Sequence, residues 1–309
     1  MIEPAVIALR LLQYAGAMVL MGSSLLFIYA LPSSGDETGA RTAWARLLLV
    51  GAGLLLALAA TLGLAAQASL LAGSVSEGLK VETLLAVVSG MDLGKAAVVR
   101  AAAALLAVFC LLALKPGRPA WIVAAVLGAV ATASLAWMGH GAATEGLIGG
   151  LHLASDVLHA LAAAVWIGAL VAFLGLLLPS PAGPDARQTT HRALHGFAGV
   201  GSASVAILVV SGVINSWILI GPDRLSALWT TPYGRLLSLK LILFVAMVGL
   251  AAANRFQHTP ALGRALEANA SSELVLRPLR RSVILETLLG LAVLGLVAWL
   301  GALGPPTSM

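Results

Sequence analysis

The chain carries little charge and few aromatic side chains. Asp, Glu, Lys and Arg together make up 10% of its 309 residues, whereas a soluble globular domain usually carries about 25%. Hydrophobic residues make up 60%, and the mean hydropathy is +1.00. These values exclude an ordinary soluble domain and indicate a protein that lies in a membrane.

Cysteine is nearly absent, and the motifs of common enzymes are not found. The single cysteine, Cys110, lies inside an apolar segment, so the sequence predicts neither a disulfide framework nor a thiolate metal cage. There is no nucleophile elbow, phosphate-binding loop or zincin motif, and we therefore expect no enzymatic activity. The net charge of +5 comes from scattered basic residues without interleaved aromatics, which does not indicate nucleic-acid binding.

Long apolar segments dominate the chain. A stretch of roughly 20 apolar residues is long enough to cross a bilayer as a helix. Eight such stretches occur, at about residues 6–31, 45–71, 93–114, 119–139, 156–178, 193–220, 234–254 and 280–303. The sequence thus predicts an all-α polytopic bundle of eight transmembrane helices in contact with lipid.

Basic residues are concentrated in alternate connections between these segments. One set of connections holds Arg41, Arg46, Lys115, Arg118, Arg187, Arg192, Arg255, Arg264, Arg277, Arg280 and Arg281, and the other set holds only Lys80 and Arg224. Connections rich in Lys and Arg usually face the cytoplasm. We therefore expect both termini on the outer side, which in a bacterium is the periplasm. The Ala, Gly and Leu-rich composition fits a bacterial inner membrane.

The two halves of the sequence resemble each other. Three pairs of positions are each 146 residues apart: Arg10 and Asp156, Gln13 and His159, and Gly22 and Gly168. Two further motifs recur, Gly94-Lys95-x4-Arg100 as Gly234-Arg235-x4-Lys240, and Ala136-Trp137-Met138-Gly139 as Ala298-Trp299-Leu300-Gly301. We predict two four-helix repeats, residues 1–140 and 141–309, related by a twofold axis along the membrane normal.

Positions that differ between the repeats are candidates for activity. Gln13 is replaced by His159, Arg10 by Asp156, and Ala302 corresponds to His140. No histidine precedes His140, so ligand-type side chains are concentrated in the second repeat.

A candidate metal site lies around the start of the fifth segment. His152, Asp156 and His159 have relative positions 0, 4 and 7, which fall on one face of a helix. The same hairpin carries Met138, His140 and Glu145. Imidazole binds copper, zinc, nickel or iron, thioether favours Cu(I), and a carboxylate can instead orient a histidine ligand.

Helix geometry argues against one ion held by the whole set. His152 and His159 are separated by about 10 Å along a helix, at 1.5 Å per residue. Two successive sites, an outer one near His140 and His152 and a deeper one near His159, fit better. The alternative is that His152 and Asp156 are interfacial polar groups and His159 is a hydrogen-bonded core residue.

Other polar or sulfur-containing side chains have two open interpretations. Met18 and Met21 either extend a thioether path or fill the core. His191 and His195, four residues apart, either form an exit site or anchor the helix at the interface. The basic residues Lys95, Arg100, Arg235 and Lys240 lie inside predicted spans and must find water or partners; they either stabilise the fold or bind an anion or lipid headgroup. Asn215 either bonds between helices or supplies an oxygen ligand.

Several of these motifs together resemble the copper resistance protein D (CopD) family of bacterial inner-membrane proteins. The resemblance is carried by Asp156-x-x-His159-x6-Trp166-x-Gly168, His195-x-Phe197, Ser211-Gly212-x2-Asn215, Thr231-Pro232-Tyr233-Gly234-Arg235-x4-Lys240, Asn254-Arg255 and Trp299-Leu300-Gly301 before Pro305-Pro306. It implies acceptance of copper in the periplasm and its movement inward, often beside a periplasmic carrier of the CopC type.

Two other functions stay open at this point. The first is membrane electron transfer by haem, with His140 paired with His152 or His159, or one of these with Met138. The second is a membrane copper-binding or assembly factor that does not transport. The chain has no Cys-x-x-Cys motif, which argues against thiolate exchange within it.

Overall fold

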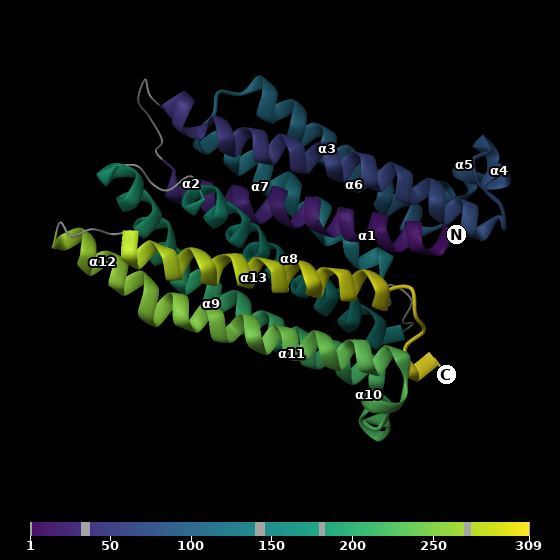
Figure 1. The fold of residues 1–309 in the computed structure, drawn as a ribbon. Coiled ribbons are helices and arrows are strands. Elements are labelled where there is room, and N and C mark those ends of the chain that lie inside the picture. The colour runs from purple at the N-terminus through teal and green to yellow at the C-terminus, as the bar shows by residue number, and fades with distance from the viewer. Residues whose placement is uncertain (1, 32–37, 140–145, 179–182, 269–272, 309) are drawn as a thin grey trace.

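The structure is a computed structural model that describes residues 2–31, 38–139, 146–178, 183–268 and 273–308. Within these ranges, eight helices are long and apolar enough to cross a membrane. They run alongside one another in a bundle, and both chain termini lie at the same end of it (Figure 1). We call this the terminal end, and the other the opposite end. The prediction of an all-α membrane bundle of eight helices is confirmed.

The spans follow one another in chain order. They are α1 (Ile2–Met18) continued by η1 (Val19–Ser23) and α2 (Ser24–Ala30), α3 (Thr38–Leu71), α6 (Asp92–Ala113), α7 (Arg118–Ala133) with η2 (Ser134–Met138), α8 (Gly146–Leu177), α9 (Pro184–Ile220), α11 (Pro232–Ala253) continued by η5 (Asn254–His258) and α12 (Thr259–Glu267), and α13 (Glu273–Leu300). Several begin earlier than predicted: the fifth starts at Gly146 and the sixth at Pro184. The sixth begins with the polar turn Pro184-Asp185-Ala186-Arg187, whereas the fifth begins with Gly146-Leu147-Ile148-Gly149, ahead of its polar residues His152 and Asp156.

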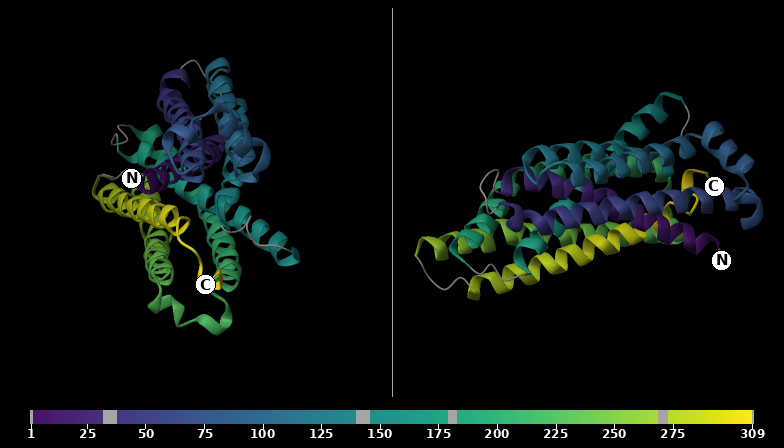
Figure 2. Two further views of the ribbon diagram at one scale, coloured as in Figure 1. Left: turned by 90° about the vertical axis from the view of Figure 1, so that its right-hand side faces the viewer. Right: turned by 90° about the horizontal axis from the view of Figure 1, so that it is seen from above.

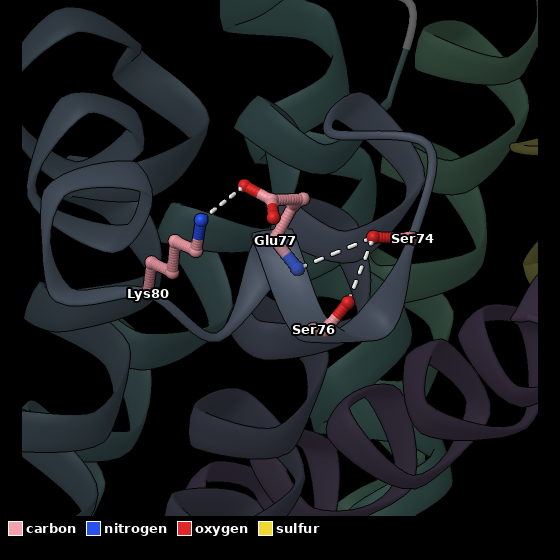
Figure 3. A network of polar contacts seen from close by, with 4 residues as sticks. All are labelled: Ser74, Ser76, Glu77 and Lys80. Carbon is pink, nitrogen blue, oxygen red and sulfur yellow. Dashed lines mark hydrogen bonds and ion pairs between the residues drawn. The ribbon is translucent and has the colours of Figure 1, made fainter.

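Short helices join the spans at the terminal end. These are α4 (Val75–Gly78), α5 (Val81–Gly90), η4 (Pro222–Arg224) and α10 (Ala227–Thr230), and a further short helix, η6 (Pro306–Ser308), follows the last span. Figure 3 shows the start of α4, where the Glu77 amide donates to Ser74 Oγ at 3.2 Å and Lys80 pairs with Glu77 at 2.7 Å. A serine cap of this kind satisfies an amide that has no partner inside the helix.

Two glycines bring the halves of the chain into backbone contact. A Cβ on Gly22 would lie 1.9 Å from the Ala164 carbonyl oxygen, and a Cβ on Gly168 would lie 2.6 Å from the Gly22 Cα. Ser23 Oγ donates to the Gly168 carbonyl at 2.7 Å across the same contact. Because small residues allow helix backbones to approach closely in membranes, this contact fixes α8 against η1.

One contact at the terminal end occurs twice, at positions that the two halves of the sequence are predicted to share. Gly139, at the end of η2, lies beside Asp156, with 3.9 Å from its Cβ position to Oδ2. Gly301, just after α13, lies beside Arg10, with 2.6 Å from its Cβ position to Nη1. The division into two repeats stays a prediction, and this reciprocal pair of contacts is what a twofold relation between them requires.

A second recurring contact involves the glycines that open α6 and α11. A Cβ on Gly94 would lie 2.2 Å from the Val87 carbonyl oxygen, and a Cβ on Gly234 would lie 2.0 Å from the Ala227 carbonyl oxygen. In each half, the glycine therefore allows a short preceding helix, α5 or α10, to fold back against the start of a span.

The halves differ in how their second and third spans pack. In the first half α3 and α6 pack closely, whereas in the described part of the second half α9 and α11 have almost no direct contact. Figure 2, in the view along the bundle, shows α9 and α11 standing apart with α10 at the connection between them. The second half is thus more open on the side between these two helices.

We expect Gly168→Ala to destabilise the protein, because its Cβ would lie 2.4 Å from the Met18 carbonyl oxygen. Overpacking of this kind costs about 1–3 kcal/mol. The control is Gly150→Ala in the same helix, where a Cβ meets nothing within 4 Å. Thermal unfolding of the purified proteins in detergent checks this, and equal melting temperatures for the two variants would contradict it.

Candidate metal site at the terminal end

Helix α8 carries all three residues that the sequence places on one face. His152 is fully buried, and its Nε2 lies 3.9 Å from Asp156 Oδ2. The Asp156 side chain is 22% exposed. A separation of 3.9 Å permits an electrostatic interaction but is too long for a hydrogen bond. The two side chains therefore lie side by side, one turn apart.

Asn215 of α9 orients the Asp156 carboxylate. Its Nδ2 donates to Asp156 Oδ1 at 2.6 Å, while Oδ2 faces Gly139 and His152. Asn215 therefore makes the hydrogen bond between helices that was one of its two predicted roles. One carboxylate oxygen is held by the amide, and the other is directed toward the end of η2.

The hydrogen bonds of Ser211 determine which nitrogen of His159 carries the proton. Ser211 Oγ donates its single hydrogen to the Ile207 carbonyl at 2.6 Å, because a carbonyl can only accept. Ser211 Oγ must then accept from His159 Nδ1, which lies 2.9 Å away. Neutral His159 thus carries its hydrogen on Nδ1 and keeps a lone pair on Nε2, the arrangement of a histidine prepared to bind a metal ion.

A cation and two phenols surround the same carboxylate. Lys240 of α11 interacts electrostatically with both Asp156 and His159. Tyr14 of α1 and Tyr233 of α11 are buried within electrostatic range of Asp156. Asp156 is therefore the shared charge of a polar cluster formed by α1, α8, α9 and α11.

The methionines lie apart from this cluster. Met138 Sδ accepts from Arg100 Nη1 at 2.7 Å, so it belongs to a different polar group. Met18 and Met21 are buried in the main apolar core, and the Met21 backbone packs against Gly128. The placement of Met18 and Met21 fits core packing, and the contact of Met138 Sδ is with Arg100.

His191 and His195 lie toward the opposite end, near the start of α9. Their rings stack with centroids 5.9 Å apart. His195 is exposed, whereas His191 faces Gly263 of α12, where a Cβ would lie 2.8 Å from His191 Nε2. The pair is thus distant from the α8 cluster along the long axis of the bundle.

A buried carboxylate is hydrogen-bonded by side chains of two other spans. Glu286 of α13 is 1% exposed and accepts from Trp166 Nε1 at 2.7 Å and from Asn254 Nδ2 at 2.9 Å. Trp166 follows His159 by two helical turns on the same face of α8. Nothing in the sequence pattern singled out this group, because its three members come from three different spans.

The residues described do not form a complete metal site by themselves. No group of three or more His, Cys, Asp or Glu side chains with metal-binding geometry occurs among them. His140 and Glu145, two of the predicted ligands, lie outside the described residues. The ligands His152, Asp156 and His159 stay predictions, and their spacing along α8 agrees with two successive sites.

The predicted intramembrane basic residues have different environments. Lys95 is exposed and pairs with Asp92 at 3.0 Å, and exposed Arg235 donates to the Trp229 carbonyl at 2.9 Å. Lys240 is associated with Asp156, as described above. Arg100 is fully buried and bonds to neutral groups. The positions that the predicted repeats pair with each other thus have unlike partners.

Together these features define a polytopic membrane protein with a polar, histidine-containing cluster inside one end of its helix bundle. The comparisons with known proteins identify the family. The family described as "Copper resistance protein D-like, N-terminal domain" matches residues 1–151, and the family "Copper resistance protein D" matches residues 191–300. The chain belongs to the copper resistance protein D family.

Individual relatives agree with this assignment. The chain is 37% identical over 306 residues to copper resistance protein D of Pseudomonas syringae pv. tomato, covering 98% of this chain and 97% of the relative. It is 33% identical over 127 residues to inner membrane protein YebZ of Escherichia coli, covering 41% and 42%. It is 29% identical over 137 residues to copper transport protein CutJ of Bacillus subtilis, covering 43% and 24%. No solved structure matches the chain.

The relatives and the eight apolar helices place the chain as a multi-pass protein of the bacterial inner membrane with a copper-related function. The haem-binding alternative receives no support from them.

We expect His159 in Ser211→Ala to carry its hydrogen on either ring nitrogen, because the hydroxyl that accepts from Nδ1 is lost. Histidine ¹⁵N chemical shifts of labelled protein report which ring nitrogen is protonated. The control is Ser204→Ala, whose buried Oγ likewise donates one turn back, to Val200 at 3.0 Å, on the same helix. A His159 signal unchanged in Ser211→Ala would contradict the assignment.

Proposed function

We propose that this protein transports copper across the inner membrane, accepting it at the terminal end and moving it inward. The distribution of basic residues supports a periplasmic terminal end, because the opposite end carries the Lys and Arg-rich connections, which usually face the cytoplasm. His152, Asp156 and His159 are the proposed ligands on α8, and His140 and Glu145 of the preceding connection are expected to add to the outer site.

The hydrogen bond between His159 Nδ1 and Ser211, and the tautomer inferred from it, support this proposal best. A half-buried histidine that merely stabilised the fold would gain most by using both ring nitrogens in hydrogen bonds. Here Ser211 holds Nδ1, and Nε2 is the nitrogen with the lone pair. Histidine ligands are typically oriented by a hydrogen bond of this kind on the second nitrogen.

Lys240 has a specific role in this mechanism. A carboxylate inside a membrane protein is costly unless a positive charge lies nearby. With no metal bound, the Lys240 ammonium offsets Asp156. An arriving copper ion supplies positive charge to the same carboxylate, so Lys240 and copper compete. Competition of this sort weakens binding and favours release, which a transporter needs.

The path continues inward along α8. Trp166, Glu286 and Asn254 form the next polar group, and His191 with His195 lies toward the opposite end. We propose these as later stations. A periplasmic carrier of the CopC type is the proposed donor, since this chain contributes no soluble domain among its described residues. A copper-binding factor without transport is the alternative, and flux measurement separates the two.

We expect His159→Ala to lower copper uptake by cells by at least about tenfold, because loss of a ligand or of its orienting partner usually costs 10–100-fold in affinity or activity. The measurement is cell-associated copper at matched expression, followed by copper flux into proteoliposomes. His258→Ala is the matched control, because His258 lies in η5 outside the proposed path. Uptake by His159→Ala equal to that of the control would refute the ligand assignment.

Lys240→Gln should bind copper more tightly than the wild type, by about tenfold. A nearby positive charge typically shifts the pKa of a carboxylate by about one unit or more, and we expect an effect of the same size on the affinity of that carboxylate for a metal cation. Copper titration against a competing chelator measures this in detergent. Arg235→Gln, which removes an exposed cation five residues away on the same helix, is the control. Weaker binding in Lys240→Gln than in Arg235→Gln would show that Lys240 does not compete with the metal.

A further inference from the structure

Arg100, in the first half, is a fully buried cation whose partners are all neutral. Its Nε donates to Ser134 Oγ at 3.0 Å, Nη2 to the Ser134 carbonyl at 2.7 Å, and Nη1 to Gln13 Oε1 and Met138 Sδ. These bonds use four of the five guanidinium N–H groups. None of them supplies the negative charge that a guanidinium in an apolar interior requires.

A second arginine faces the same space. Arg10, Gln13, Gln67, Arg100 and Met138 line a cavity of about 30 Å³ near the terminal end. Arg10 Nη1 is buried and has no hydrogen-bond partner among the described residues. None of the described residues that line the cavity is acidic. Two positive charges therefore share a small cavity in which no described residue supplies a carboxylate.

Comparison with the second half explains what this cavity lacks. Arg10 is equivalent to Asp156, Gln13 to His159, and Arg100 to Lys240. In the second half the cation Lys240 interacts with the Asp156 carboxylate. In the first half the position of that carboxylate is occupied by another cation. The described residues of the first half thus supply the cations of a charge pair but no anion beside them.

We propose that this cavity binds a small inorganic anion of the chloride class. A cavity needs roughly 10–15 Å³ to hold one water molecule, so a volume of about 30 Å³ suits a single monatomic ion. Arg10 Nη1, the fifth N–H of Arg100 and the Gln13 amide are the donors. Gln13 Nε2 already donates to the Leu9 carbonyl at 3.3 Å, which leaves its other hydrogen for the ion. The site is independent of copper binding.

The test is a chloride titration of the purified full-length protein, followed by the ³⁵Cl NMR line width. We expect saturable broadening that bromide displaces. Arg10→Gln should weaken chloride binding about 10- to 100-fold, as expected for the loss of one charge-assisted hydrogen bond. Arg235→Gln, an exposed arginine outside the cavity, should leave the titration unchanged. No saturable broadening in the wild type, or equal binding in Arg10→Gln and Arg235→Gln, would overturn the proposal.

Gln67→Glu provides a variant that does not rely on removing a buried cation. It places a carboxylate in the cavity, as Asp156 does in the second half. We expect it to abolish chloride binding and to make the melting temperature independent of chloride, whereas the wild type should melt higher in chloride than in gluconate. Chloride stabilisation that persists in Gln67→Glu would place the anion elsewhere and contradict the assignment.

Discussion

The close backbone contact between Gly22 and Gly168 is the constraint on which the arrangement of this molecule depends. It allows the first span of each half to approach the other without intervening side chains, and Ser23 adds a hydrogen bond to the Gly168 carbonyl. With these two helices in contact, the end of each half reaches the polar residue of the other. Gly139 lies beside Asp156 and Gly301 lies beside Arg10 for this reason.

Because the interior of the bundle is apolar, each polar side chain within it needs a partner. Ionisable groups inside a membrane protein need partners, and the two halves meet this need differently. In the second half the Asp156 carboxylate is the centre of one cluster with a lysine and the histidines of α8. In the first half two arginines and two glutamines surround a cavity. The same scaffold thus holds a carboxylate-centred cluster in one half, where we propose a copper site, and paired cations in the other, where we propose an anion site.

The sequence predicted the membrane bundle well, because roughly 20-residue apolar segments have few other uses. The shared helical face of His152, Asp156 and His159 could also be predicted, since it depends only on helical spacing. The role of Ser211 could not be predicted, because Ser211 lies on another helix. Its hydrogen bond to the Ile207 carbonyl uses the hydroxyl hydrogen, so the bond to Ile207 matters as much as the bond to His159. Met138 was grouped with the histidines by nearness in sequence, yet the structure directs its sulfur to Arg100.

The open packing of α9 and α11 links these observations to transport. In the first half the corresponding helices, α3 and α6, pack closely and enclose Arg100. In the second half Lys240 on α11 and Ser211 on α9 approach the histidine from helices that barely touch each other. A small movement of α11 relative to α9 would change the distance between Lys240 and Asp156 without breaking a packed interface. The weak contact therefore lies where the proposed competition between Lys240 and a metal ion would need freedom of movement, and the tightly packed half would serve as the frame for that movement.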